Sequence, residues 1–169
     1  NKGDLIGFSI IARDISERRR LEQEIKSFIT KLARSEERYR ALFEHAPDPI
    51  LVTDANDIVL LCNERAEVYF GFKAEEMVGK PARLITPDDL IEERAWLKEQ
   101  VKHRGYVTGF ETERVVKGGV RVPVELTEAT IRDDKGDLIG FSIIARDISE
   151  KRRLEQEAEA KEFYRTLSI

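Results

Sequence analysis

A long run of alternating apolar and polar positions marks the first part of the chain as a helix. No Gly or Pro interrupts the sequence from Ile15 to Ala46, and apolar residues recur alternately after four and three positions. This spacing is the a/d pattern of a coiled coil. The expected seam is Leu21, Ile25, Phe28, Leu32, Ser35, Tyr39 and Leu42, with Ser35 as its weak position. We expect parallel self-association along this seam; the alternative is an amphipathic helix that packs on its own domain.

Short apolar runs in the middle of the chain predict β-strands. Ile50–Thr53 and Ile58–Cys62 flank the segment 54–57, whose Asp and Asn residues favour a tight turn, so a β-hairpin is expected. Further strands are predicted at Gly109–Val116, at Val120–Thr127, where apolar and polar residues alternate, and at Leu138–Arg146. The last of these is apolar on both faces, which indicates a central strand or one covered on both sides.

Helices are predicted between the two groups of strands. Asn63 can cap a short helix over Glu64–Phe70 that ends at Gly71. A second short helix is expected at Lys73–Val78. A longer one is expected from about Asp88 to His103, with Leu90, Leu97 and Val101 on one face and Arg94 as a polar interruption. Two strands, then helices, then three strands predict an α+β domain with an antiparallel sheet and helices on one face.

An internal repeat predicts how the chain is organised. Residues 1–24 and 134–157 differ at only two of 24 positions, and the segment 36–43 resembles 161–168. The chain therefore reads as part of a tandem array. We expect the terminal strand and exit motif of a preceding unit at 1–15, a helical linker at 16–36, a complete unit at 37–149, a second linker at 150–161 and the start of a following unit at 162–169. The duplicated strand Leu5–Arg13 lacks its own domain here, so it is predicted to pair with another chain or another sheet.

Both predicted linkers begin with the same motif. Asp14-Ile15-Ser16-Glu17 and Asp147-Ile148-Ser149-Glu150 place an acidic cap three residues before a Glu. This is a capping box, which satisfies free amide donors and fixes where the strand ends and the helix begins. We expect such a junction to pass a small strand movement into the long helix.

Composition narrows the function further. The 169 residues are 37% charged, with a net charge of −4, so there is no basic surplus for binding nucleic acid. Cys62 is the one cysteine, which fits a reducing compartment. No apolar run approaches the roughly 18 residues of a membrane span, and no signal peptide is visible. A soluble, cytoplasmic segment without direct membrane insertion is expected.

Most of the chain resembles the PAS family. The matching stretches are YRALFEHAPDPILVTD, IVLLCNERAEVYFGFKAEEMVGK, GGVRVPVEL and GFSIIARDISEKRRLEQE, which together span residues 37–157. The resemblance implies a five-stranded antiparallel sheet with helices that enclose a cavity. It also implies sensing, dimerisation and signal relay within a protein such as a sensor histidine kinase of a two-component system. In this family an Asp-x-Ser/Thr motif couples the last strand to the output helix, a role carried here to Asp147, Ile148 and Ser149, and to Asp14 and Ser16 for the preceding unit.

The residues argue against the cofactors known in this family. Haem would need a histidine on the long helix, whereas His45 precedes the first strand and His103 ends the helix. Blue-light flavin chemistry would need Asn-Cys-Arg on a cavity helix, whereas Cys62 ends a strand. No cofactor is therefore assigned, although non-covalent flavin stacking on Trp96 and an unknown small ligand stay open. The expected cavity lining, or simply core, is Tyr69, Met77, Leu84, Leu97, Phe110 and Ile143.

No catalytic or metal constellation is recognisable. Neither HExxH nor CxxC occurs, the Gly118-Gly119 pair is a hairpin turn rather than a phosphate loop, and no order of Ser, His and Asp is convincing. We therefore expect a sensory and dimerising module, joined to adjacent units and an output domain in the same chain. A cofactor-binding sensor and an enzyme on the same fold are the alternatives.

Overall fold

The structure is a computed structural model that describes residues 3, 7, 10 and 12–167. It divides into two compact units, residues 1–41 and 42–169, which are described here one at a time. Most of the predicted strand Leu5–Arg13 lies outside the described residues, so that strand and its pairing stay predictions.

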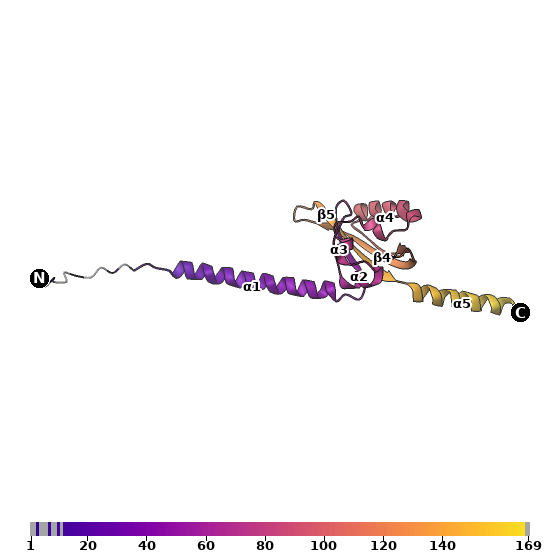
Figure 1. The fold of residues 1–169 in the computed structure, drawn as a ribbon, viewed down its shortest axis with the longest axis horizontal. Coiled ribbons are helices and arrows are strands. Elements are labelled where there is room, and N and C mark those ends of the chain that lie inside the picture. The colour runs from indigo at the N-terminus through magenta and orange to yellow at the C-terminus, as the bar shows by residue number, and fades with distance from the viewer. Residues whose placement is uncertain (1–2, 4–6, 8–9, 11, 168–169) are drawn as a thin grey trace. The chain divides into compact units, whose positions relative to one another are not determined.

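A single long helix dominates the first unit. Helix α1 (Ser16–Glu44) runs without a break through the predicted linker and into the start of the second unit (Figure 1). None of its residues is buried. The seam positions Leu21, Ile25, Phe28 and Leu32 are 46%, 59%, 69% and 59% exposed. Pairs such as Arg18–Glu22, with 2.7 Å between nitrogen and oxygen, lie along its surface at i,i+4 spacing.

The second unit is built on an antiparallel sheet of five strands. The strands are β1 (Ile50–Asp54), β2 (Val59–Cys62), β3 (Tyr106–Val115), β4 (Arg121–Arg132) and β5 (Leu138–Asp147). Their order across the sheet is β2-β1-β5-β4-β3. The predicted α+β architecture is confirmed, and β5 is the central strand that its two apolar faces indicated.

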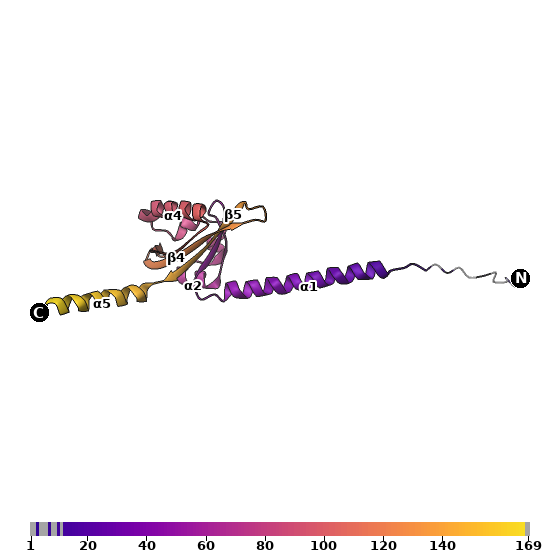
Figure 2. The same ribbon diagram turned by 180° about the vertical axis from the view of Figure 1, so that it is seen from behind.

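Helices connect β2 to β3 and follow β5. They are α2 (Glu64–Phe70), α3 (Ala74–Met77), the 3-10 turns η1 (Ala82–Ile85) and η2 (Asp88–Leu90), α4 (Ile91–Arg104) and α5 (Ser149–Leu167). Helix α4 lies over the sheet beside β3 and β4 (Figure 2). As predicted, Asn63 caps α2 and Gly71 ends it, in the left-handed conformation.

Three predicted boundaries were wrong by three residues or more. Strand β4 ends at Arg132 rather than at Thr127. The long helix begins as a 3-10 turn at Asp88 and becomes an α-helix only at Ile91, because Pro87 and the turn before it set the approach of the chain. Strand β3 begins at Tyr106 rather than Gly109. A bulge between Val107 and Phe110 carries the strand through Gly109, whose φ is +69°, so that glycine lies within the strand instead of starting it.

The core lies between the inner face of the sheet and the helices. On the sheet the core residues come from β1, β4 and β5: Leu51, Val124, Leu126, Phe141 and Ile143. They pack against α2, α3 and α4, whose buried residues include Ala66, Phe70, Met77, Leu97 and Val101. At Gly140 a Cβ would lie 2.0 Å from the carbonyl oxygen of Thr53. Only glycine therefore lets β5 approach β1 at this point.

Candidate functional site

The interior between α4 and the sheet holds a cluster of charged side chains. Arg94 and Lys98 lie one turn apart on the face of α4 that also carries Leu97 and Val101, and the four point to the same side because of the helical period. Arg94 is 6% exposed and Lys98 9%. On the sheet, Arg114 of β3 and Glu128 of β4 are each 1% exposed. Buried charges of this kind require partners, since desolvation of an ion costs several kcal/mol.

Ion pairs connect α4 to the β1–β2 turn and to β4. The Asp57 carboxylate receives the Arg94 guanidinium on one oxygen, and Lys98 Nζ lies 3.0 Å from the other. The same Nζ lies 3.0 Å from Glu128 Oε2 and 4.0 Å from the centre of the Phe141 ring. Lys98 is thus held by two carboxylates and an aromatic face.

The β1–β2 turn is shaped to present Asp57 to this cluster. The Asp54 carboxylate accepts hydrogen bonds from the amides of Asn56 and Ile58, each 2.9 Å long. Asp57 takes a φ of +68°, a left-handed conformation that Asp tolerates better than most residues. Its side chain is 24% exposed, so it lies at the rim of the cluster.

Among the described basic residues of the cluster, Arg114 is the one for which no ion pair forms. Its Nη1 donates to the carbonyl oxygen of Glu113 at 2.7 Å, but its buried Nη2 has no hydrogen-bond partner among the described residues. No carboxylate of the described chain lies within ion-pair distance of Arg114. Burial, followed by the positive charge of Arg94, lowers the pKa of Arg114 to about 10, while the negative charges of Glu128, Glu93 and Asp57 act in the opposite direction.

The residues expected to line a cavity mostly lie in the packed core. Met77, Leu97 and Ile143 are 1%, 1% and 2% exposed, and the partly buried Tyr69 and Phe110 pack against the same core cluster. Leu84 lies apart from them and is 39% exposed. Trp96 is 55% exposed with its ring centre 6.0 Å from that of Phe110.

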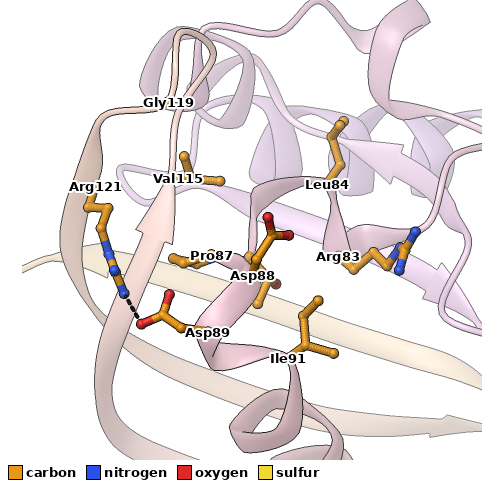
Figure 3. Close-up of a pocket in the computed structure, with 10 residues that line it drawn as sticks. Arg83, Leu84, Pro87, Asp88, Asp89, Ile91, Val115, Gly119 and Arg121 are labelled. Atoms are coloured by element: carbon orange, nitrogen blue, oxygen red, sulfur yellow. Dashed lines mark hydrogen bonds and ion pairs between the residues drawn. The ribbon is translucent and has the colours of Figure 1, made fainter.

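Leu84 borders an open surface pocket instead. The pocket has a volume of about 580 Å³ and lies between the η1–η2 segment and the hairpin of β3 and β4 (Figure 3). Arg121 and Asp89 face each other across one side, with 3.0 Å between Nη2 and Oδ2. The hydrogen bond from Arg121 lowers the pKa of Asp89, as expected for an exposed ion pair.

Sequence reasoning missed the charged interior. It took Arg94 as a polar interruption and assigned no role to Lys98, Arg114, Glu128 or Asp57. A signal was present: Glu128 continues the inward register of Val124 and Leu126 on β4, a position where an acidic residue is unusual.

The exit junction is tightly bonded. The Asp147 carboxylate accepts a 2.8 Å hydrogen bond from the Ser149 amide. Ile148 is 3% exposed, and its amide donates to the carbonyl oxygen of Pro123 on β4 at 3.2 Å. Its own carbonyl accepts the Arg152 amide, the first hydrogen bond of α5. A single buried residue therefore separates the central strand from the helix.

The junction at the start of α1 has the same local bonding. The Asp14 carboxylate accepts a 2.9 Å hydrogen bond from the Ser16 amide, and this bond lowers the pKa of Asp14. In both junctions the acidic cap forms, but within the described part of the chain Glu17 and Glu150 do not bond back to the Asp amides. The predicted capping box is therefore only half formed, and the acidic residue caps by an Asx-type turn.

Asn63 joins the end of α1 to the start of α2. It is completely buried, and its side-chain amide donates to the carbonyl oxygens of Phe43 and Asp48, each at 3.1 Å. Its Oδ1 accepts from the amides of Ile50 and Ala66, each at 2.9 Å. One side chain thus fixes the last turn of α1, the first strand and the N-terminus of α2.

The other end of α2 lies beside the exit junction. Burial, followed by the negative charge of the Asp147 carboxylate, raises the pKa of the Tyr69 hydroxyl to about 12. Tyr69 is on the last turn of α2, whereas Asn63 is its N-cap. The short helix α2 is therefore capped by a residue bonded to the incoming helix, and its Tyr69 is close enough to feel the charge of the residue that caps the outgoing one.

The residues considered for cofactors take structural positions. His103 is exposed in the last turn of α4. Burial, then the charges of Glu67 and Glu44, raise the pKa of Cys62 to about 11, which keeps it a thiol. Among the described residues no group of His, Cys, Asp and Glu is arranged to hold a metal ion. Likewise, no helix in the described ranges has the length and apolar character needed to cross a membrane.

Comparisons with known proteins agree on one family. The PAS fold model matches residues 37–148. The methanogenesis regulatory histidine kinase FilI of Methanothrix harundinacea is 28% identical over 130 residues, 75% of this chain and 14% of that protein. The methyl sulfide methyltransferase-associated sensor of Methanosarcina acetivorans is 29% identical over 125 residues, 73% of this chain and 12% of that protein. The chain thus spans a small part of the length of these relatives.

A solved structure agrees in fold along most of the chain. The PAS domain of a protein from Colwellia psychrerythraea is 26% identical and superposes with a TM-score of 0.62. The match covers 68% of this chain and 97% of that domain. The likeness therefore extends over an entire PAS domain.

Proposed function

The chain belongs to the PAS family, and from this premise we propose that it is a sensory and dimerising relay module rather than an enzyme. In this proposal a change in the interior of the PAS domain moves β5, and the Asp147-Ile148-Ser149 junction passes that movement to α5. The observation that carries the proposal is the direct continuation of the central strand into a capped helix through buried Ile148. Because only Ile148 separates β5 from α5, a shift of β5 would move the start of the helix.

A second contact supports the same direction of relay. Helix α2 is tied to the end of α1 by Asn63, and its Tyr69 lies beside Asp147. We infer that a displacement of the incoming helix can reach the junction through this one short helix. The input would then be either a structural change inside the domain or a displacement of α1 caused by a preceding unit.

Dimerisation is proposed for the linker helices. The apolar stripe of α1 has no buried residue, and Tyr39 and Leu42 continue it at 56% and 72% exposure. Burial of an exposed apolar stripe of this length against a second copy is the usual way to stabilise such a helix. In α5, Leu154 and Phe163 are similarly exposed, at 51% and 62%.

The parent protein is proposed to be a sensor histidine kinase of a two-component system. This rests on the names of the two relatives, a regulatory histidine kinase and a sensor, each of which is far longer than this chain. On this proposal the output domain and the neighbouring PAS units, to which residues 1–15 and 162–169 would belong, lie in the same polypeptide. The cytoplasmic location expected from the sequence stays a prediction.

The experiment that tests the relay measures the order of α5 in the dimer. A spin label is placed at Arg165→Cys in a Cys62→Ser background, and pulsed electron resonance gives the distance between the two labels. We expect one narrow distance distribution, because the capped junction fixes the helix. Asp147→Ala, which removes the cap, should broaden it, while Asp134→Ala in the exposed β4–β5 turn should not.

The outcomes separate the two parts of the proposal. Equal widths in the parent and in Asp147→Ala would contradict the relay through the junction. No dipolar signal at all in the parent chain would contradict the dimer.

A further inference from the structure

The two linker helices have the same ends but different lengths. Residues 1–24 recur at 134–157, an offset of 133 positions, whereas residues 36–43 recur in similar form at 161–168, an offset of 125. The stretch between the two repeated segments is therefore eight residues shorter in α5 than in α1. Eight residues are one more than a heptad, so the apolar positions at the two ends of α5 cannot share one seam as they do in α1.

A single seam runs along α1. From Leu21 to Leu42 the seam positions are separated by four and three residues in strict alternation, which is the 3.5-residue period of a coiled coil. The ion pair of Arg20 and Glu24 lies beside this seam rather than on it. A strict heptad period fits another helix with the same period, which is why the expected occupant is a second copy of the chain.

Two half seams lie on α5 instead. The first, counted from the exit junction, would continue through Leu154, Ala158, Lys161 and Arg165. The second, counted back from the start of the next unit, is Arg153, Glu157, Ala160, Tyr164 and Leu167. Each is apolar in one half of the helix and charged in the other. The charged half of the second seam is an ion pair, with 2.8 Å between Arg153 Nη1 and Glu157 Oε1.

The backbone of α5 does not absorb this difference in phase. The helix is regular from Ser149 to Leu167, without a 3-10 or π turn in it. The two half seams are offset by one residue and therefore lie about 100° apart around the helix axis. Leu154 is 51% exposed, and Tyr164 and Leu167 are 68% and 66% exposed. A second helix that packs along one of these half seams leaves the other half seam turned away from it.

We propose that α5 is a two-register helix, which pairs with α5 of a second copy through one half seam at a time, whereas α1 pairs through one fixed seam. The two registers of α5 exchange by a rotation of about 100°. The register through Tyr164 and Leu167 buries the larger side chains and predominates, which keeps the label distances on α5 narrow. This inference rests on the proposed dimer and names the movement that the relay would produce.

The difference between the helices gives them different roles. A displacement at the exit junction turns α5 toward the seam of Leu154 and so rotates whatever follows the helix. Helix α1 has no second seam to turn to, so it holds its neighbours in one orientation. The chain thus combines a fixed spacer before the PAS domain with a rotating output helix after it.

Disulfide cross-linking tests the two registers, because oxidation traps each of them. Single cysteines are placed in the full chain in a Cys62→Ser background, and the cross-linked dimer is measured after oxidation. We expect both Ala158→Cys and Ala160→Cys to cross-link, since each lies on one half seam. Glu159→Cys, which lies on neither, should cross-link at least tenfold less.

The matched pair on α1 has the same spacing. Ile25→Cys lies on the fixed seam and should cross-link, whereas Ser27→Cys, two residues further on, should cross-link at least tenfold less. Cross-linking of Ala160→Cys at the low level of Ser27→Cys would overturn the two registers. So would cross-linking of Glu159→Cys at the level of its neighbours.

Insertion of one alanine should act in opposite directions on the two helices. Between Ala158 and Glu159 it restores the heptad phase and joins the half seams, so self-association measured by sedimentation should tighten by about tenfold or more. Between Ser27 and Phe28 it divides the seam of α1, so association should weaken by about tenfold or more. A change in the same direction for both insertions would overturn the proposal.

The outcomes also separate this inference from the proposed function. A dimer whose α5 cross-links along one unbroken seam would overturn the two registers and leave dimerisation and the relay in place. A chain that sediments as a monomer and forms no cross-link on either helix would overturn the dimer and the two registers together.

Discussion

Helices α4 and α1 arrange their side chains in opposite ways. Helix α4 buries charge: Arg94 and Lys98 are 6% and 9% exposed and face the sheet. Helix α1 exposes apolar side chains: Ile25 and Phe28 are 59% and 69% exposed. The two differ because the partners of α4 are residues of the same domain, whereas Leu21, Ile25, Phe28 and Leu32 of α1 are each 46% or more exposed. The buried charges thus reflect contacts within the domain, whereas we propose that the exposed stripe of α1 contacts a second copy of the chain.

The comparison predicts the largest loss of stability for the buried ion pair between Lys98 of α4 and Glu128 of β4. Glu128→Ala removes one of the two carboxylates that hold Lys98. We expect the free energy of unfolding to fall by about 3–5 kcal/mol, because an ammonium group is left incompletely compensated. Urea unfolding followed by circular dichroism measures the change.

The control for this prediction lies on the same helix. Glu99 forms an exposed pair with Lys102, so Glu99→Ala should change stability by no more than about 0.5 kcal/mol. Equal losses of unfolding free energy in the two variants would show that burial does not set the strength of these ion pairs. The contrast between α4 and α1 would then be contradicted.

A smaller and different effect is expected on α1. Phe28→Ala should weaken self-association by about 1.5–3 kcal/mol for each Phe28 side chain that the dimer buries. The stability of the PAS domain itself should stay the same, because Phe28 belongs to the other unit. Sedimentation equilibrium measures the association, with Thr30→Ala, on the opposite side of the helix, as the matched variant. A chain that sediments as a monomer before any substitution would sink the prediction.

The smallest effect on stability is expected at Tyr69, on the last turn of α2. Its pKa is raised to about 12 from 10.0, so the neutral phenol is favoured in the folded state. The stability that this provides is complete below pH 10.0 and is lost as the pH rises toward about 12. Tyrosinate absorbance should contain a late-titrating step that Tyr69→Phe removes. If the step persists in that variant, the hydroxyl beside Asp147 is not its source.

Local patterns were enough to predict most of the fold. The cap at Asn63, the stop at Gly71, the hairpin turn at 54–57 and the central position of β5 all follow from short-range chemistry or from one strand's composition. The start of β3 was misplaced, because a glycine in a bulge has the same sequence appearance as a glycine before a strand.

The charged site could not be predicted in the same way. Arg94, Arg114 and Glu128 come from three elements, and nothing within any one of them shows that the others lie nearby. From the sequence alone, each of these three residues is expected to be a solvated side chain, since charged residues are rarely buried. Only the alternation of β4, which places Glu128 in the inward row, carried a hint.

The most direct test of the account asks whether a change inside the domain reaches α5. Native-state hydrogen exchange is measured at the amides of Ser149 and Arg152 in the parent chain, in Glu128→Gln and in Glu99→Gln. We predict that Glu128→Gln, which keeps the shape but removes the buried charge, alters the protection of these amides severalfold, while Glu99→Gln does not. Unchanged protection in Glu128→Gln, with the interior demonstrably altered, would contradict the relay.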